Sequence, residues 1–169
     1  MLRHWLRVLA LLGCIIGLGL LLGLLAALIT GKRAYADGIH DLAATVWAES
    51  RSESAEGQLA VAFVILNRLE CCPEKWGRTI GEVVRRPHQF SVWTGKRRAA
   101  RLQRLHDGVP GFREAKQIAQ LALSGKVQDP TAGALFFTTA RMKPPSWTQG
   151  LIAQRIGNHV FYRLKGRFK

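Results

Sequence analysis

The spacing of apolar residues after position 37 predicts two helices. Apolar side chains recur at helical intervals from Ile39 to Trp47, and Asp37 can cap the start of this helix. A second helix is predicted from a cap at Ser54 to Leu69, because the run "LAVAFVIL" belongs to a segment that is too long for a typical strand. Since that run is apolar on every side, we expect it to form the central helix of the core.

Two further helices follow in the pattern. Thr79 and Glu82 form a T-x-x-E capping box, and the short helix that it opens must end close to Pro87. Residues 110–124 place apolar side chains on one helical face, and Gly125 is positioned as a C-terminal cap. The first 125 residues therefore predict helices alone.

The pattern becomes strand-like near the carboxyl end. Residues 133–139, "GALFFTT", and residues 159–164, "HVFYRL", are short and rich in β-branched and aromatic side chains. We expect these two segments to pair in a small antiparallel sheet. Helices followed by strands indicate an α+β fold.

A continuous apolar segment precedes all these elements. Residues 8–29 contain no charge over 22 positions, which is long enough to cross a bilayer. A retained transmembrane anchor is therefore favoured, while an A-x-A pattern within residues 34–37 also fits a cleaved signal peptide. The sequence predicts two parts: a signal or anchor helix with a short linker at residues 1–36, and one catalytic domain at residues 37–169.

Charge narrows the range of partners. The whole chain has a net charge of +14, and residues 37–169 hold 21 basic and 11 acidic residues, a net charge of +10. Such a surface suits a polyanion, whether nucleic acid, anionic lipid or an acidic wall polymer. The densest cluster, "GKRRAARLQR" at residues 95–104, has no interleaved aromatic side chain on which bases could stack, so no nucleic-acid partner is expected. A solvated basic surface explains the cluster almost as well.

Missing motifs exclude several kinds of chemistry. The three cysteines, Cys14, Cys71 and Cys72, match no zinc or redox spacing, so we expect neither a metal site nor a disulfide framework. The chain also has no G-x-S-x-G elbow, no H-x-x-x-H pair and no glycine-rich phosphate loop. Carboxylate chemistry without a cofactor remains.

Glu49 is the candidate general acid. It follows the apolar face of the first predicted helix, where loss of water would raise its pKa toward neutrality. Glu53 and Glu56 lie among serines, which indicates wetter surroundings. The structural alternative is an ion pair between Glu49 and either Arg51 or Arg68.

Three sequence blocks together resemble a known family. They are "AESRSESAEGQLAVAFVILNRL" at residues 48–69, "HQFS" at residues 88–91 and "IGNHVFY" at residues 156–162. They resemble the cell wall hydrolase family of the spore cortex-lytic enzyme type, whose blocks look like A-E-A-x-G-E, E-G-Q-x-A-V-A ending in N-R, Q-F-S and G-N-H-x-F-Y. The resemblance extends from about residue 42 to residue 162, nearly all of the predicted domain.

The resemblance implies a peptidoglycan lytic transglycosylase in a mostly helical, lysozyme-like domain. The first glutamate of the A-E-A block, which is Glu49 here, would protonate the oxygen between N-acetylmuramic acid and N-acetylglucosamine. It would then assist the muramyl 6-hydroxyl in attacking the anomeric carbon, which leaves a 1,6-anhydro product. No second carboxylate is needed as a nucleophile, unlike in the usual glycosidase pair.

The resemblance also implies a set of substrate-binding residues. Glu53 aligns with the second glutamate of the block, where it could orient the substrate or Glu49, and a structural hydrogen bond is as good an interpretation. Gln89 and Ser91 would line one side of the cleft. Asn158 and His159 would line its other wall, and a satisfied, partly buried histidine is the alternative for His159.

Two features depart from the family pattern. Ser50 and Ser52 stand where the family has alanine and glycine, which puts a tight glycine turn in doubt. The basic stretch Lys96–Arg104 has no counterpart that the motifs assign, and its candidate ligands are teichoic acid, lipid headgroups and the peptide acids of peptidoglycan.

The sequence thus predicts a wall-cleaving enzyme, anchored in the membrane or exported, that acts on peptidoglycan strands in the periplasm or cell wall space. A glycine-rich anchor ahead of such a domain also resembles the signal-anchor-release arrangement of some phage endolysins. Two alternatives stay open. One is a hydrolytic muramidase, and the other is a non-catalytic, basic protein that binds wall or membrane.

Overall fold

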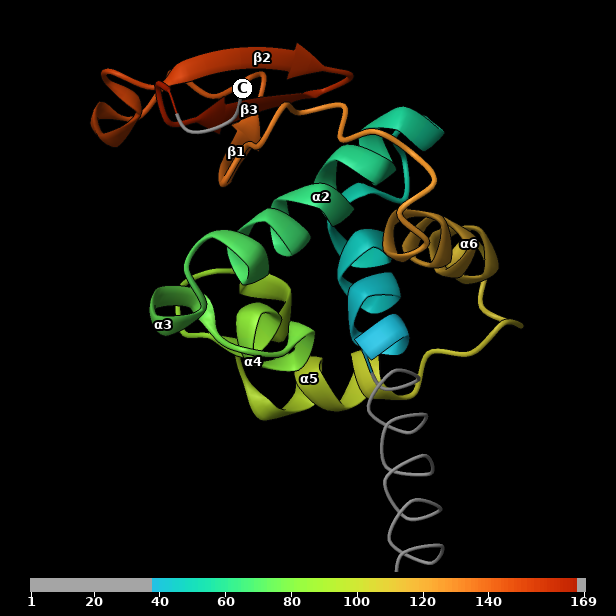
Figure 1. The fold of residues 1–169 in the computed structure, drawn as a ribbon. Helices are drawn as coiled ribbons and strands as arrows, with labels where there is room; N and C mark the ends of the chain where they lie inside the picture. Colours follow the sequence, from blue (N-terminus) through green and yellow to red (C-terminus); the bar gives the residue numbers. More distant parts are fainter. Residues whose placement is uncertain (1–37, 167–169) are drawn as a thin grey trace, which may run out of the picture. The chain divides into compact units, whose positions relative to one another are not determined.

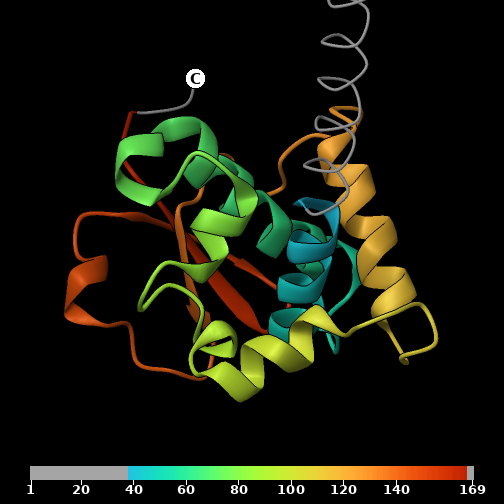
Figure 2. The same cartoon turned by 90° about the horizontal axis from the view of Figure 1, so that it is seen from below.

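The computed structural model describes residues 38–166, and Figures 1 and 2 show its elements. They are, in order, a helix of residues 38–50, α2 (Ala55–Cys71), α3 (Pro73–Trp76), α4 (Ile80–Arg85), the 3-10 turn η1 (Ser91–Trp93), α5 (Lys96–Gln103), α6 (Phe112–Leu123), β1 (Phe136–Thr139), the 3-10 turn η2 (Ser146–Thr148), β2 (Ile152–Ile156) and β3 (His159–Arg163). The predicted α+β order, with helices first and strands last, is confirmed for this range.

The predicted anchor of residues 8–29, the A-x-A pattern and the Asp37 cap lie outside the described residues, and the boundary after residue 36 stays a prediction. Within residues 38–166, no helix combines the length and the apolar character that a membrane span requires.

The helix of residues 38–50 ends where the sequence placed Glu49. Its face of Leu42, Val46 and Trp47 is buried. Ser50, which is also buried, donates its hydroxyl proton to the carbonyl oxygen of Val46, 2.8 Å away. This bond inside the last turn satisfies a polar group that would otherwise be costly to bury. Serine therefore fits a position at which the family has alanine.

α2 is the central helix, as predicted from its apolar run. Ser54 caps it, because its hydroxyl oxygen accepts a hydrogen bond from the backbone nitrogen of Gly57. Five of the six residues at positions 60–65 are apolar and buried: Ala60, Val61, Ala62, Val64 and Ile65. Helices on one side and the sheet on the other surround α2 in Figure 1.

The carboxyl half of α2 is joined to the loop before β1. Asn67 donates from its amide to the carbonyl oxygen of Ala134, 3.1 Å away, and to the carboxylate of Asp129, 2.9 Å away. The guanidinium of Arg68 donates to the carbonyl oxygen of Leu135 at 2.8 Å. These bonds give the buried carbonyl groups of the loop their partners and fix where β1 begins.

The predicted capping box at α4 forms only in part. The Thr79 hydroxyl accepts from the backbone nitrogen of Glu82, whereas the Glu82 carboxylate accepts from the backbone nitrogen of Arg78 instead of closing back on Thr79. The helix ends at Arg85, two residues before Pro87, as its ring requires.

Two short helices were not predicted. α3 begins with Pro73, whose ring suits the first turn of a helix. α5 occupies the basic stretch, with exposed arginines on its outer side and Leu102 buried beneath. Three basic residues at its start precede Ala99 and Leu102, the two apolar residues of α5 that pack on the core, so basic residues dominate the local sequence.

The sheet has three antiparallel strands in the order β1-β3-β2. The predicted pairing of the two aromatic segments is confirmed, with Phe136 opposite Tyr162 and Thr139 opposite His159. β2 is an additional edge strand, and it joins β3 through the two-residue loop Gly157–Asn158. Gly157 has φ +58°, which glycine adopts without steric cost.

The absence of disulfides predicted from the sequence is wrong for one pair. Cys71 and Cys72 form a disulfide between adjacent residues, at the junction of α2 and α3. Spacing rules overlook this pair because they describe disulfides that close longer loops, whose Cα atoms are usually about 4.4–6.8 Å apart.

Candidate active site

A cavity of about 690 Å³ lies between the helices and the sheet. Its wall combines the end of the helix of residues 38–50, α2, the loop around η1, β1 and the loop from β1 to β2. The lining residues are Glu49, Arg68, His88, Gln89, Ser91, Phe136, Phe137, Thr138, Thr139, Trp147, Leu151 and Leu164. We call this cavity the cleft.

Glu49 is the carboxylate of the cleft. It lies in the last turn of its helix and is partly buried. Burial raises its pKa above the ordinary glutamate value of 4.5. Among the described residues its carboxylate has no salt bridge or side-chain hydrogen bond, so no neighbouring charge offsets the loss of water.

The two proposed ion-pair partners of Glu49 are engaged elsewhere. The Arg51 guanidinium lies 4.7 Å from the centre of the Trp47 ring. Arg68 lies within 4.7 to 5.9 Å of three ring centres, those of Trp76, Phe90 and Phe136. Neither arginine holds Glu49 in a structural pair.

Arg68 is a buried cation on the cleft wall, which the sequence did not single out for the site. Only 4% of the residue is exposed, and burial lowers its pKa to about 10. One of its nitrogens, Nη1, is buried without a hydrogen-bond partner within the described part of the chain. Among the described residues no carboxylate forms a salt bridge with Arg68, so its charge stays unpaired at the cleft wall.

η1 is held against the helix of Glu49 by polar contacts, one of them buried and one partly exposed. The Trp93 indole donates to the Thr45 hydroxyl at 2.9 Å. Arg85 forms a bidentate pair with Asp41 on the same helix, at 2.5 and 2.6 Å, and its guanidinium lies 4.6 Å from the Trp93 ring centre. These contacts place the loop that contains Gln89 and Ser91 beside Glu49.

Trp147 is an exposed aromatic residue on the opposite wall. Half of it is accessible to solvent, and its ring packs against those of Phe136 and Tyr162 at 5.5 and 5.6 Å between centres. A flat ring that is fixed from behind and open in front can stack on a sugar face. Its isolated position in the segment "KPPSWTQG" gave no periodic signal in the sequence.

Glu53, Asn158 and His159 form a cluster of their own next to the cleft. The Glu53 carboxylate accepts from the Asn158 backbone at 3.0 Å and from its side-chain amide at 3.1 Å. The His159 Nδ1 atom lies 3.9 Å from the same carboxylate. A Cβ atom on Gly157 would collide with Glu53, so glycine is required for this approach.

The wetter setting expected for Glu53 is wrong. Its side chain is 5% exposed, and the hydrogen bond from the Asn158 backbone, together with the Asn158 amide and His159, lowers its pKa against the opposing effect of burial. Burial lowers the pKa of His159, with Glu53 acting in the opposite sense. His159 also packs edge-on against Phe137, a residue of the cleft wall, at 5.3 Å.

The structure therefore brings three of the predicted site residues together at the cleft, namely Glu49, Gln89 and Ser91. Glu53, Asn158 and His159 lie together behind it. Ser52 is exposed and has no positive φ, so the turn after Glu49 does not need a glycine there. In the described part of the chain, no three side chains among His, Cys, Asp and Glu gather as metal ligands would.

Comparison with known proteins identifies the class. Residues 52–162 match the model of the family described as Cell Wall Hydrolase. The chain belongs to the cell wall hydrolase family, as its three sequence blocks indicated. The match begins three residues after Glu49, so it leaves the role of that residue untested.

Two solved structures are similar to this chain. The catalytic domain of the SleB protein of Bacillus cereus has a TM-score of 0.62 and 29% sequence identity, over 76% of this chain and 91% of that one. The catalytic domain of the germination-specific lytic transglycosylase SleB of Bacillus anthracis has a TM-score of 0.59 and 29% identity, over 75% and 93% of the two chains. A search of curated proteins found no match.

Proposed function

We propose that this protein is a lytic transglycosylase that cleaves the bond between N-acetylmuramic acid and N-acetylglucosamine in peptidoglycan, with Glu49 as the general acid and base. The observation that supports it most directly is Glu49 itself, a carboxyl without a polar partner in the cleft, whose pKa is raised by burial. Membership of the cell wall hydrolase family and the similarity to a lytic transglycosylase domain agree with this assignment.

The raised pKa suits the first chemical step. A glutamic acid that remains protonated nearer to neutral pH can donate its proton to the leaving glycosidic oxygen. The resulting carboxylate can then accept the proton of the muramyl 6-hydroxyl as that oxygen bonds to the anomeric carbon. The proton is thereby recovered, and the product is a 1,6-anhydro sugar.

The rest of the cleft favours an internal nucleophile. Among the described residues that line it, Glu49 is the one carboxylate, whereas glycosidases that hydrolyse through a carboxylate pair place two across the scissile bond. Each carboxylate oxygen of Glu53 accepts a hydrogen bond from Asn158, so Glu53 does not serve as the second carboxylate of such a pair. Gln89, Ser91 and Trp147 also line the cleft and are available to bind the glycan strand. Because that substrate is peptidoglycan, the proposed site of action is the periplasm or cell wall space.

Mass analysis of the muropeptides released from purified sacculi tests this proposal. Wild-type protein is expected to release 1,6-anhydro products, which are lighter by one water than hydrolysed ends. Glu49→Gln is expected to lower the rate by a factor of at least about 1,000. Glutamine is similar in size to glutamate, but it has no acidic proton to donate to the glycosidic oxygen.

A matched control is Glu56→Gln, which replaces an exposed glutamate of the same segment and should retain full activity. Fully hydrated reducing ends would instead identify a hydrolytic muramidase. Full activity of Glu49→Gln would contradict the assigned role, and an inactive wild-type protein would favour a binding protein.

A further inference from the structure

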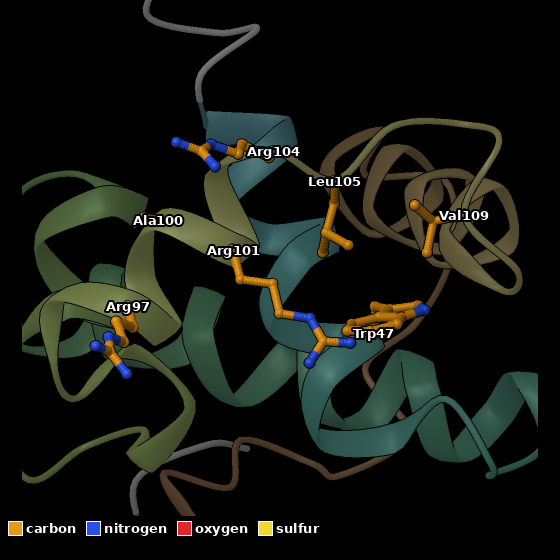
Figure 3. A pocket seen from close by; sticks show the side chains of 7 residues that line it. All are labelled: Trp47, Arg97, Ala100, Arg101, Arg104, Leu105 and Val109. Carbon is orange, nitrogen blue, oxygen red and sulfur yellow. The ribbon is translucent and has the colours of Figure 1, made fainter.

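A second hollow, separate from the cleft, lies between α5 and the helix of residues 38–50. Its volume is about 510 Å³, and Figure 3 shows the side chains that line it: Trp47, Arg97, Ala100, Arg101, Arg104, Leu105 and Val109. We call it the basic pocket. Three arginines and no acid lie on its described wall, so it suits an anion.

The pocket combines an apolar floor with exposed positive charge. Trp47 is fixed by a hydrogen bond from its indole to the carbonyl oxygen of Pro110, 2.9 Å away. Leu105 and Val109 approach the same ring in Figure 3, and Arg101 extends toward it from α5. Such a floor accepts small apolar groups, while guanidinium groups around it bind carboxylates.

No salt bridge among the described residues neutralises the arginines of this pocket. None of the salt bridges within residues 38–166 involves a residue of α5, and no acidic residue occurs between Glu82 and Asp107 in the sequence. By contrast, Arg85 and Lys116 are paired with aspartates. The unpaired arginines are exposed and available to a ligand.

A smaller hollow of about 270 Å³ lies between the basic pocket and the cleft. It shares Trp47 and Arg101 with the basic pocket and Ser91 with the cleft. Arg98 of α5 donates to the carbonyl oxygen of Ser91 at 3.4 Å, which joins the two regions. A ligand covalently attached to a glycan strand in the cleft could therefore extend into the basic pocket.

We infer that the basic pocket binds the acidic peptide stem of the glycan strand that occupies the cleft. The inference rests on the proposed function, since it names the part of peptidoglycan that this second site recognises. The stem carboxylates pair with Arg97, Arg101 and Arg104, and its alanyl methyl groups pack on Trp47. A flat layer of lipid headgroups would make less use of a hollow that adjoins the cleft through shared wall residues.

The first test compares glycan strands that retain their stems with strands from which an amidase has removed them. The measured quantity is the ratio of kcat/KM for the two substrates. We expect the wild-type ratio to be about ten or more, and Arg101→Ala to reduce it roughly five- to tenfold through KM. Arg101→Lys should restore part of the ratio, because charge is retained without the bidentate fork.

Arg113→Ala is the matched control, because Arg113 is an exposed arginine of α6 outside both hollows. This variant should keep the wild-type ratio. Equal cleavage of both substrates by wild-type protein would overturn the inference and leave the proposed function intact.

A second test measures binding without cleavage. The Glu49→Gln protein is titrated with a stem-bearing muropeptide, with the same muropeptide after amidation of its carboxyl groups, and with phosphatidylglycerol vesicles. We expect tighter binding of the acidic muropeptide by roughly tenfold, dependent on Arg101. Such binding, found together with a wild-type protein that cleaves neither substrate of the first test, would support the pocket and contradict the proposed function. Equal binding of the amidated form, or Arg101-dependent binding of vesicles alone, would overturn the inference.

Discussion

Glu49 and Glu53 are four residues apart, and their surroundings shift their pKa values in opposite directions. Glu49 has lost water without gaining a partner, so its neutral form is favoured. Glu53 accepts two hydrogen bonds from Asn158, so its ionised form is favoured. At the residue scale, hydrogen-bond donors decide which of two buried glutamates can serve as an acid.

The first prediction concerns the stability of Glu49→Gln. The raised pKa means that folding favours neutral Glu49. This advantage is complete below the ordinary value of 4.5 and is lost as pH rises through the folded-state pKa. Glutamine stays neutral at every pH. The melting temperature of the variant should therefore exceed that of the wild-type protein at pH 7 and equal it at pH 4. A lower melting temperature for the variant at pH 7 would contradict this account.

The second prediction concerns Glu53→Gln. The amide group of glutamine would face one of the two Asn158 donors, which should cost about 1–3 kcal/mol of unfolding free energy at pH 7. Because the Glu53 pKa is lowered, its contribution is present above 4.5 and is lost as pH falls through the folded value. Urea denaturation should show a smaller difference in unfolding free energy between the wild-type protein and the variant at pH 3 than at pH 7. Exposed Glu56→Gln, the control, should change stability by less than about 0.5 kcal/mol.

At the element scale, local signals placed the main helices well. Ser54 and Thr79 cap α2 and α4 as predicted, because a capping hydroxyl bonds a backbone nitrogen only three residues away. β2 was missed because its exposed residues alternate poorly, and it is ordered by pairing with β3. α5 was not predicted because basic residues dominate its sequence and Leu102 is its one fully buried residue, so the sequence indicates a basic surface stretch.

The third prediction tests the cap of the central helix. Ser54→Ala removes the acceptor of the Gly57 backbone nitrogen and should cost about 1 kcal/mol of unfolding free energy. Chemical denaturation measures it. Ser52→Ala is the matched control, since Ser52 is exposed in the preceding turn and should change stability by less than about 0.5 kcal/mol. Equal losses in both variants would exclude the cap as the cause.

At the scale of the whole molecule, the cleft exists only because distant segments meet. Glu49, Ser91 and Trp147 come from three parts of the chain that lie some 40 to 60 residues apart in the sequence. The bonds of Asn67 and Arg68 to the loop before β1, and of Trp93 to Thr45, hold these parts in place. Substrate binding should therefore depend on side chains that no local motif contains.

The fourth prediction concerns Trp147. Removing its exposed ring in Trp147→Ala should raise KM for glycan strands roughly tenfold, about 1.4 kcal/mol of binding free energy, with a smaller effect on kcat. Steady-state kinetics measures both values. Met142→Ala is the control, because Met142 is an exposed apolar residue of the same loop but does not line the cleft. The KM of this variant should match the wild-type value.

The sequence by itself determined the family, the α+β order, the caps at Ser54 and Thr79 and the choice of Glu49 as the candidate acid, because these depend on spacing within short segments. Only the tertiary structure showed that Glu53 accepts hydrogen bonds from Asn158 and that Arg68 and Trp147 line the cleft. It also showed that the arginines of α5 line the basic pocket. Those features depend on contacts between residues far apart in the chain, and burial and hydrogen bonding are properties of the packed molecule.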